Sequence, residues 1–136
     1  MESERRPRIG DSEKITINLG YVDLGQIDLL VQEGFYSNRT DLIRTAIRNQ
    51  LDRHAEALKQ SVVRRQFELG LREFTKAQLE KARDDGEKLH IQVLGLAVIA
   101  PDVSPQLALQ TIAAIHVLGA LQASPAVKAA LGDRIR

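Results

Sequence analysis

The pattern of apolar and polar positions begins with a short alternating segment at residues 14–19. One face of this segment is apolar, with Ile15, Ile17 and Leu19. The opposite face is polar, with Lys14, Thr16 and Asn18. Strict alternation predicts a half-buried β-strand, which ends at Gly20. A strand of six residues cannot satisfy its backbone alone, so we expect it to pair with another strand.

Two short helices are predicted to follow. Residues 22–33 carry an apolar stripe with three- and four-residue spacing, and Gly34 is placed to end this helix in a left-handed conformation. The second helix is predicted to start at Asn38, where Asn38 and Asp41 form a capping-box pattern. In that pattern the Asn38 side chain accepts from the third amide of the helix, and the Asp41 carboxylate reaches back. Apolar residues then keep a helical period as far as Leu51.

Residues 55–88 are predicted to be a helical connector. Between residues 39 and 85 there is no proline and a single glycine, Gly70. The apolar line moves to a different face after Arg65, so we expect a break or kink near residues 64–75, or two helices. Whether the helix over residues 39–85 is continuous stays open.

The tail, residues 89–136, contains an internal repeat. Ile91–Leu96 matches Ile115–Ala120 at an offset of 24, and each segment is later followed by a Ser-Pro pair. Serine as N-cap with proline at the first helical position predicts a helix after Ser104 and after Ser124. Strand, loop and short helix, written twice, are typical of solenoid-like β/α repeats, which usually need about three units to be stable. We therefore expect these residues to build a higher oligomer in which another chain supplies the missing neighbours. The alternative is a two-stranded unit packed on the long helix of its own chain.

Composition narrows the class of protein. The 136 residues are 43% hydrophobic, so the chain can bury a core as one ordinary domain or two small ones. There is no run of 18 apolar residues and no secretory signal pattern, so we expect a cytoplasmic protein without a membrane span. The absence of cysteine excludes disulfides, thiolate metal sites and a cysteine nucleophile. The tail carries only five charged side chains, which favours packing within or between chains: Asp102, Lys128, Asp133, Arg134 and Arg136.

The order of strand, helix, turn and helix over residues 14–54 resembles the ribbon-helix-helix family of DNA-binding repressors, which includes the Arc, MetJ and CopG-type proteins. The stretches that carry the resemblance are Lys14-Ile-Thr-Ile-Asn-Leu19 and Gly34-Phe-Tyr-Ser-Asn-Arg-Thr-Asp-Leu-Ile-Arg44. The resemblance implies a homodimer through residues 14–54. In such a dimer two strands pair as an antiparallel ribbon that enters the major groove of double-stranded DNA.

Candidate DNA-contacting residues follow from this arrangement. The polar face of the strand would contact bases, since lysine can donate to guanine, asparagine can bond adenine and threonine can contact either: Lys14, Thr16 and Asn18. The start of the second helix would bind a backbone phosphate through Ser37, Asn38 and Arg39. Residues 1–13 are predicted to be a flexible arm, which either follows DNA through Arg5, Arg6 and Arg8 or is a solvated tail. Three further arginines are interpreted as a solvated helix face: Arg44, Arg48 and Arg53.

The predicted fold is therefore mostly α with short β: a ribbon-helix-helix domain, a long helix and a small C-terminal β/α repeat domain. The predicted function is a nucleoid-associated, sequence-specific transcriptional regulator that represses by occluding a promoter. The net charge of +1 gives weak attraction to DNA, so cooperative assembly through the tail would add affinity. Two alternatives stay open: a self-assembling scaffold driven by the repeats, and an antitoxin whose tail wraps a toxin. An antitoxin tail is usually polar and disordered when free, which this apolar tail does not resemble.

Enzymatic and metal-dependent functions have little support in the sequence. The three histidines do not form a recognisable ligand set: His54, His90 and His116. There is no glycine-rich phosphate loop, and the acidic residues near Gly86 are interpreted as a helix end. We therefore expect no catalytic residues, no metal and no cofactor.

Overall fold

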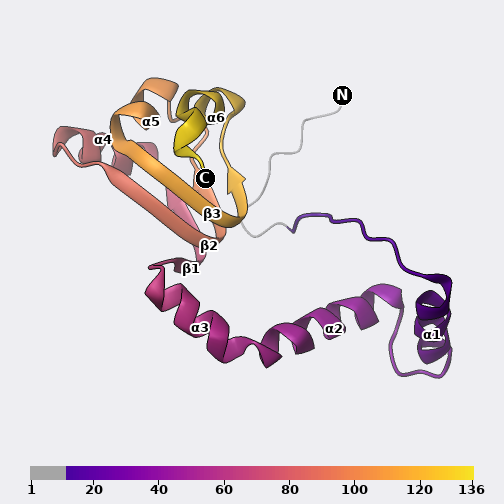
Figure 1. Cartoon of the computed structure of the whole chain (residues 1–136). Coiled ribbons are helices and arrows are strands. Elements are labelled where there is room, and N and C mark those ends of the chain that lie inside the picture. The colour runs from indigo at the N-terminus through magenta and orange to yellow at the C-terminus, as the bar shows by residue number, and fades with distance from the viewer. Residues whose placement is uncertain (1–11) are drawn as a thin grey trace, which may run out of the picture. The chain divides into compact units, whose positions relative to one another are not determined.

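The computed structural model describes residues 12–136 (Figure 1). Residues 14–61 form one compact unit, and residues 62–136 make up most of a second. We call them the N-terminal unit and the repeat unit. The candidate arm residues lie outside the described residues: Arg5, Arg6 and Arg8.

The N-terminal unit contains α1 (Tyr21–Gln32) and α2 (Arg39–Arg53), and α3 (Ala55–Arg64) starts within it. Gly34 follows α1 with a φ of 86°, which confirms the predicted left-handed residue at the helix end. No residue of these three helices is buried. The apolar stripes of α1 and α2 are at most partly buried in a single chain, which leaves them able to pack against another partner.

The segment predicted to be a half-buried strand is neither paired nor buried in the single chain. Residues 12–20 form no helix or strand. Their apolar side chains are exposed, with Ile15 at 74%, Ile17 at 59% and Leu19 at 40%. A strand exists only with a partner that takes its backbone hydrogen bonds, and the described residues contain no such partner for this segment.

The repeat unit consists of three successive strand–helix pairs. Its elements are β1 (Glu68–Phe74), α4 (Lys76–Asp84), β2 (Leu89–Ile99), α5 (Pro105–Thr111), β3 (Ile112–Gln122) and α6 (Pro125–Leu131), followed by a 3₁₀ turn at Gly132–Arg134. The strands form a parallel sheet in the order β1-β2-β3. Ile91 lies opposite Ile115 and Gly95 opposite Gly119, so the offset of 24 read from the sequence is the strand register.

The prediction of a helical connector over residues 55–88 is wrong in its middle. The helix ends at Arg64, Gln66 takes a left-handed φ of 57°, and β1 follows. Residues 68–74 are strand because they pair with β2 and bury Phe74, and such tertiary contacts override local helix propensity. The two-unit repeat is corrected to three units for the same reason. The chain supplies its own third neighbour, so the tail is neither an incomplete stack nor a two-stranded unit.

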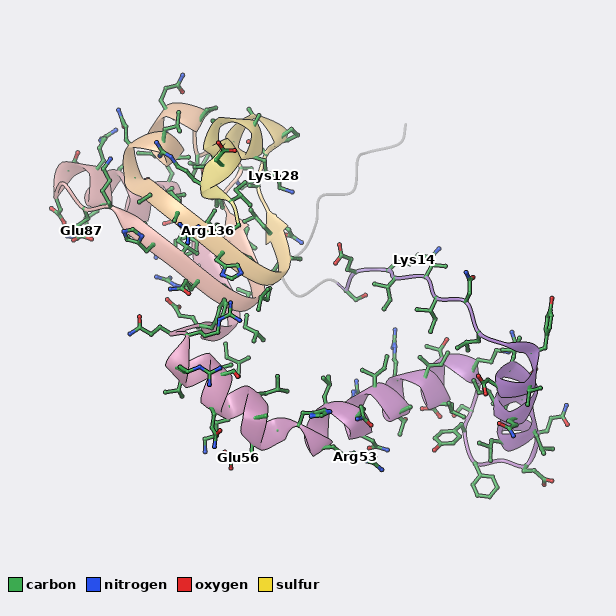
Figure 2. All side chains as sticks on the ribbon, in the orientation of Figure 1. Lys14, Arg53, Glu56, Glu87, Lys128 and Arg136 are labelled. Carbon is green, nitrogen blue, oxygen red and sulfur yellow. The ribbon has the colours of Figure 1, made fainter. Side chains whose placement is uncertain are left out.

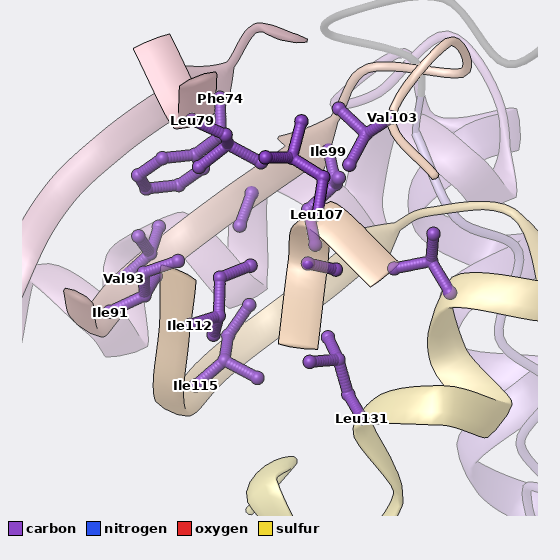
Figure 3. Close-up of a cluster of buried hydrophobic side chains, with 13 residues drawn as sticks. Phe74, Leu79, Ile91, Val93, Ile99, Val103, Leu107, Ile112, Ile115 and Leu131 are labelled. Atoms are coloured by element: carbon purple, nitrogen blue, oxygen red, sulfur yellow. The ribbon is translucent and has the colours of Figure 1, made fainter. Parts of the chain in front are cut away.

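A single hydrophobic core lies between the sheet and its helices (Figure 3). Alternate positions of β2 point into it, including Ile91, Val93 and Ile99, and Leu79 and Leu107 enter from α4 and α5. The α5 helix contacts both α4 and α6, so the helices stack in the same order as the strands.

The helix starts predicted from the two Ser-Pro pairs are confirmed. The Ser104 hydroxyl accepts from the amide of Leu107, and the Ser124 hydroxyl accepts from the amide of Val127, each at 3.1 Å. These caps fix where α5 and α6 begin over the sheet.

Candidate nucleic-acid interface

The polar residues of the alternating segment lie exposed on the approach to α1. Lys14, Thr16 and Asn18 are all solvent-exposed, and Figure 2 shows Lys14 projecting from this segment. No hydrogen bond or ion pair engages these three side chains among residues 12–136. Their donors and acceptors are therefore available to an external partner.

The start of α2 is built by two local hydrogen bonds. The Asn38 side chain accepts from the amide of Asp41 at 2.8 Å, which confirms the predicted N-cap. The Asp41 carboxylate accepts from the amide of Ser37 at 2.9 Å, one residue before the position that a capping box would use. The second contact of the predicted capping box is therefore wrong, because Asp41 accepts from the Ser37 amide and not from the Asn38 amide. The Ser37 amide is thus engaged by Asp41, and the Ser37 hydroxyl is the group of this residue that could donate to a phosphate.

Arg39 is held by a bidentate ion pair with Asp28 of α1. Its Nε and Nη2 donate to the two carboxylate oxygens of Asp28, each at 2.8 Å. The hydrogen bonds from Arg39 lower the pKa of the Asp28 carboxyl, and the carboxylate in turn raises the pKa of Arg39. The pair ties the start of α2 to α1. It leaves Nη1 of Arg39 as the nitrogen without a partner in this pair.

A polar hollow of about 400 Å³ opens beside the start of α2. Its lining combines hydroxyls, an amide, a carboxylate and two guanidinium groups: Ser37, Asn38, Thr40, Asp41, Arg44, Thr45 and Arg48. Arg44 and Arg48 are four residues apart and so share one helix face. Hydroxyl, amide and guanidinium donors around a helix N-terminus are suited to bind a phosphate group.

This hollow brings together residues that the sequence interpretation kept apart. Ser37 and Asn38 were candidate phosphate contacts, whereas Arg44 and Arg48 were interpreted as solvated. Arg39 does not line the hollow. The signal for the two arginines was present as the four-residue spacing of Thr40, Arg44 and Arg48, which places all three on the face that starts at the N-cap.

Metal binding and membrane crossing find no support in the described residues. Among residues 12–136 there is no group of three or more His, Asp or Glu side chains that could hold a metal ion. His116 packs edge-on against the ring of Phe67, with a centroid distance of 5.2 Å. In the same part of the chain, no helix combines the length and the apolar character that a membrane crossing needs.

Comparison with known proteins agrees with the geometry of the N-terminal unit. A model of the Ribbon-Helix-Helix transcriptional regulator family matches residues 10–128. No curated protein and no solved structure matches the chain. The family match extends beyond residues 14–54 and takes in most of the repeat unit. The chain therefore belongs to the ribbon-helix-helix transcriptional regulator family, a membership that implies DNA binding and dimerisation.

Proposed function

We propose that the protein is a sequence-specific transcriptional repressor that reads the major groove with a two-stranded ribbon. Residues 14–19 of two copies form this ribbon. The observation that carries the proposal is the segment itself, which is unpaired, apolar on one face and polar on the other. It stands in a unit whose helices bury no residue in a single chain.

Dimerisation supplies what the single chain lacks. Pairing the segment with its copy satisfies the backbone, and it turns Ile15, Ile17 and Leu19 toward the apolar stripes of α1 and α2. Full burial of each such side chain contributes roughly 1.5–3 kcal/mol. The polar face then points outward, where Lys14, Thr16 and Asn18 can reach base edges.

Phosphate binding at the start of α2 fixes the ribbon in its groove. The Ser37 hydroxyl, the Asn38 amide and the two guanidinium groups of Arg44 and Arg48 surround the hollow that would receive the phosphate. Arg39 contributes mainly by holding α2 against α1, and its Nη1 is left for a second contact. Such a dimer represses by occupying promoter DNA in the nucleoid, with no catalytic step, metal or cofactor.

Two other functions compete with this proposal. The two outer strands favour a self-assembling scaffold as the second candidate, because among the described residues β1 has no further partner strand and β3 has only the bridge to Ile135. An antitoxin with a disordered tail is a poor fit, because residues 68–131 form an ordered three-unit repeat with its own core.

Selection of bound sequences from a randomised pool of duplex DNA tests the proposal. A two-fold dimer should enrich an inverted repeat, because each half-site meets the same strand face. Binding to the enriched sequence should exceed binding to its shuffled version at physiological salt. Enrichment of no motif, with equal and strongly salt-dependent binding to all duplexes, would support the scaffold instead.

A further inference from the structure

A row of three glycines crosses the parallel sheet. Gly70, Gly95 and Gly119 lie in register on β1, β2 and β3. All three have φ between 118° and 138°, a conformation that side chains rarely adopt. A Cβ at Gly95 would lie under 3.0 Å from the carbonyl oxygen of Gly70, and a Cβ at Gly119 equally close to that of Gly95. Each of these two positions is glycine because the carbonyl of the preceding strand occupies the space of a side chain.

The two ends of this row are complementary. Gly70 has the same backbone conformation, yet no described heavy atom lies within 4 Å of a Cβ built on it. Its space is open to a carbonyl that the described residues do not supply. At the other end, Gly119 lies on the outer strand β3, and no glycine of the described residues pairs beyond it.

We propose that β3 of one copy pairs in parallel with β1 of a second copy, with Gly119 opposite Gly70. The carbonyl of Gly119 then fills the space at Gly70 as the carbonyl of Gly70 fills that at Gly95. The occupant of each sheet edge is thus the opposite edge of another copy of this chain. This gives the tail assembly a definite geometry, and it does not require DNA binding.

The register of the existing sheet fixes the contact. Val93 pairs with both Glu68 and Val117, so Glu68 of the second copy would lie opposite Val117. The next residues of β1, as far as Glu73, would then lie opposite β3 up to its last residue, Gln122. The C-terminal residues occupy the start of this edge, where Ile135 pairs in parallel with Ile115 and the Arg136 amide donates to the Ile115 carbonyl. The proposed contact begins two residues further along β3, at Val117.

The side chains beside the glycine row fit the same arrangement. Leu69, Leu94 and Leu118 lie in register next to the glycines. The outer two are exposed, Leu69 at 73% and Leu118 at 42%. Pairing β3 with β1 of the second copy would set these two leucines side by side and continue the row.

Such an interface joins two different surfaces of the chain. Head-to-tail contacts of this kind form rings or open chains according to the rotation between copies, whereas the ribbon dimer uses the same surface twice and closes. Together the two contacts would link dimers into arrays.

Cysteine cross-linking without DNA tests the arrangement, since the natural chain contains no cysteine. Leu69→Cys and Leu118→Cys place thiols at residues that would be neighbours between copies. Within one chain the two positions are two strands apart, about 10 Å, which exceeds the Cα separation of roughly 4.4–6.8 Å that a disulfide spans. Because both leucines are exposed, the variants should fold, and circular dichroism checks that they do.

The oxidised double variant should give a ladder of dimers, trimers and larger species on a non-reducing denaturing gel. An equal mixture of the two single variants should stop at dimers, and each single variant alone should remain uncross-linked. Covalent dimers of a single variant would overturn the proposal, because they require like surfaces to meet. Absence of cross-links in the double variant and the mixture would overturn it as well.

A second variant probes the open glycine position directly. Gly70→Ala puts a methyl group where the Gly119 carbonyl of the next copy would lie. Sedimentation velocity should show loss of species larger than the dimer, while the dimer remains. Large species that persist in a folded Gly70→Ala protein would contradict the glycine contact.

Discussion

The guanidinium of Arg39 binds both carboxylate oxygens of Asp28, and this ion pair links α2 to α1. The two groups lie eleven residues apart, and their side chains are 54% and 42% exposed. Arg39 was predicted from the sequence to be a phosphate contact. Its guanidinium ties the N-terminus of α2 to α1, and Arg39 does not line the polar hollow.

Asp28→Asn should reduce the stability of the N-terminal unit in a pH-dependent way. The pKa of Asp28 is lowered in the folded chain, so the pair stabilises the fold above the ordinary carboxyl pKa of about 3.9. That stabilisation is lost as the pH falls through the lowered pKa. Chemical denaturation across a pH series should show a gap between the natural chain and the variant that closes in acid. Asp52→Asn is the matched control, and a gap that persists unchanged at low pH would contradict the assignment.

Arg44→Ala and Arg48→Ala should weaken DNA binding equally on the selected sequence and on unrelated DNA. Each change removes one phosphate contact, so the slope of log affinity against log salt should fall by about 1. Arg53→Ala is the control, because Arg53 lies on the same helix outside the hollow. Anisotropy titrations at several salt concentrations provide the measurement. Equal behaviour of all three variants would exclude the hollow as a phosphate site.

Leu79→Ala tests whether the first strand–helix pair belongs to the core of the repeat unit. Leu79 is fully buried, and truncation of such a leucine costs about 2–5 kcal/mol of unfolding free energy. Val63→Ala is the control at a side chain that is 71% exposed. Urea denaturation followed by circular dichroism compares the two. A loss for Leu79→Ala as small as that for Val63→Ala would mean that residues 68–84 are not part of the folded unit.

Gly95→Ala should cost about 1–3 kcal/mol more than Gly70→Ala in dilute protein, because overpacking adds to the shared backbone strain. Both positions require a left-handed φ, but only Gly95 faces a carbonyl of its own chain. Thermal unfolding at low concentration separates the two contributions. Equal losses would mean that backbone strain alone explains why glycine occupies the row.

Local chemistry made part of the fold predictable. The caps at Ser104 and Ser124 and the left-handed Gly34 depend on residues close in sequence, and the register of β2 with β3 follows the 24-residue offset of the repeat. The first repeat unit was not predictable in the same way. Its central Leu69-Gly70-Leu71 segment lies among charged residues that suit a helix, and its strand conformation depends on pairing with β2.

The candidate site was partly predictable for similar reasons. The N-cap at Asn38 follows from residue type and spacing. The bond from the Ser37 amide to Asp41 and the pair between Asp28 and Arg39 depend on how the α1–α2 turn closes, which spacing alone does not determine. The ribbon lies beyond any single chain, because its second strand comes from another copy.

The most direct test of the account is the DNA affinity of the triple variant Lys14→Ala, Thr16→Ala and Asn18→Ala. Fluorescence anisotropy would be measured on the selected duplex and on its shuffled version. The control variant replaces three exposed residues of α3 by alanine: Glu56, Lys59 and Gln60. Loss of roughly 1–3 kcal/mol for each base contact predicts at least a ~100-fold weaker complex on the selected duplex, with the dimer mass unchanged. Unchanged affinity for the selected duplex in a dimeric triple variant would contradict the ribbon as the DNA-reading element.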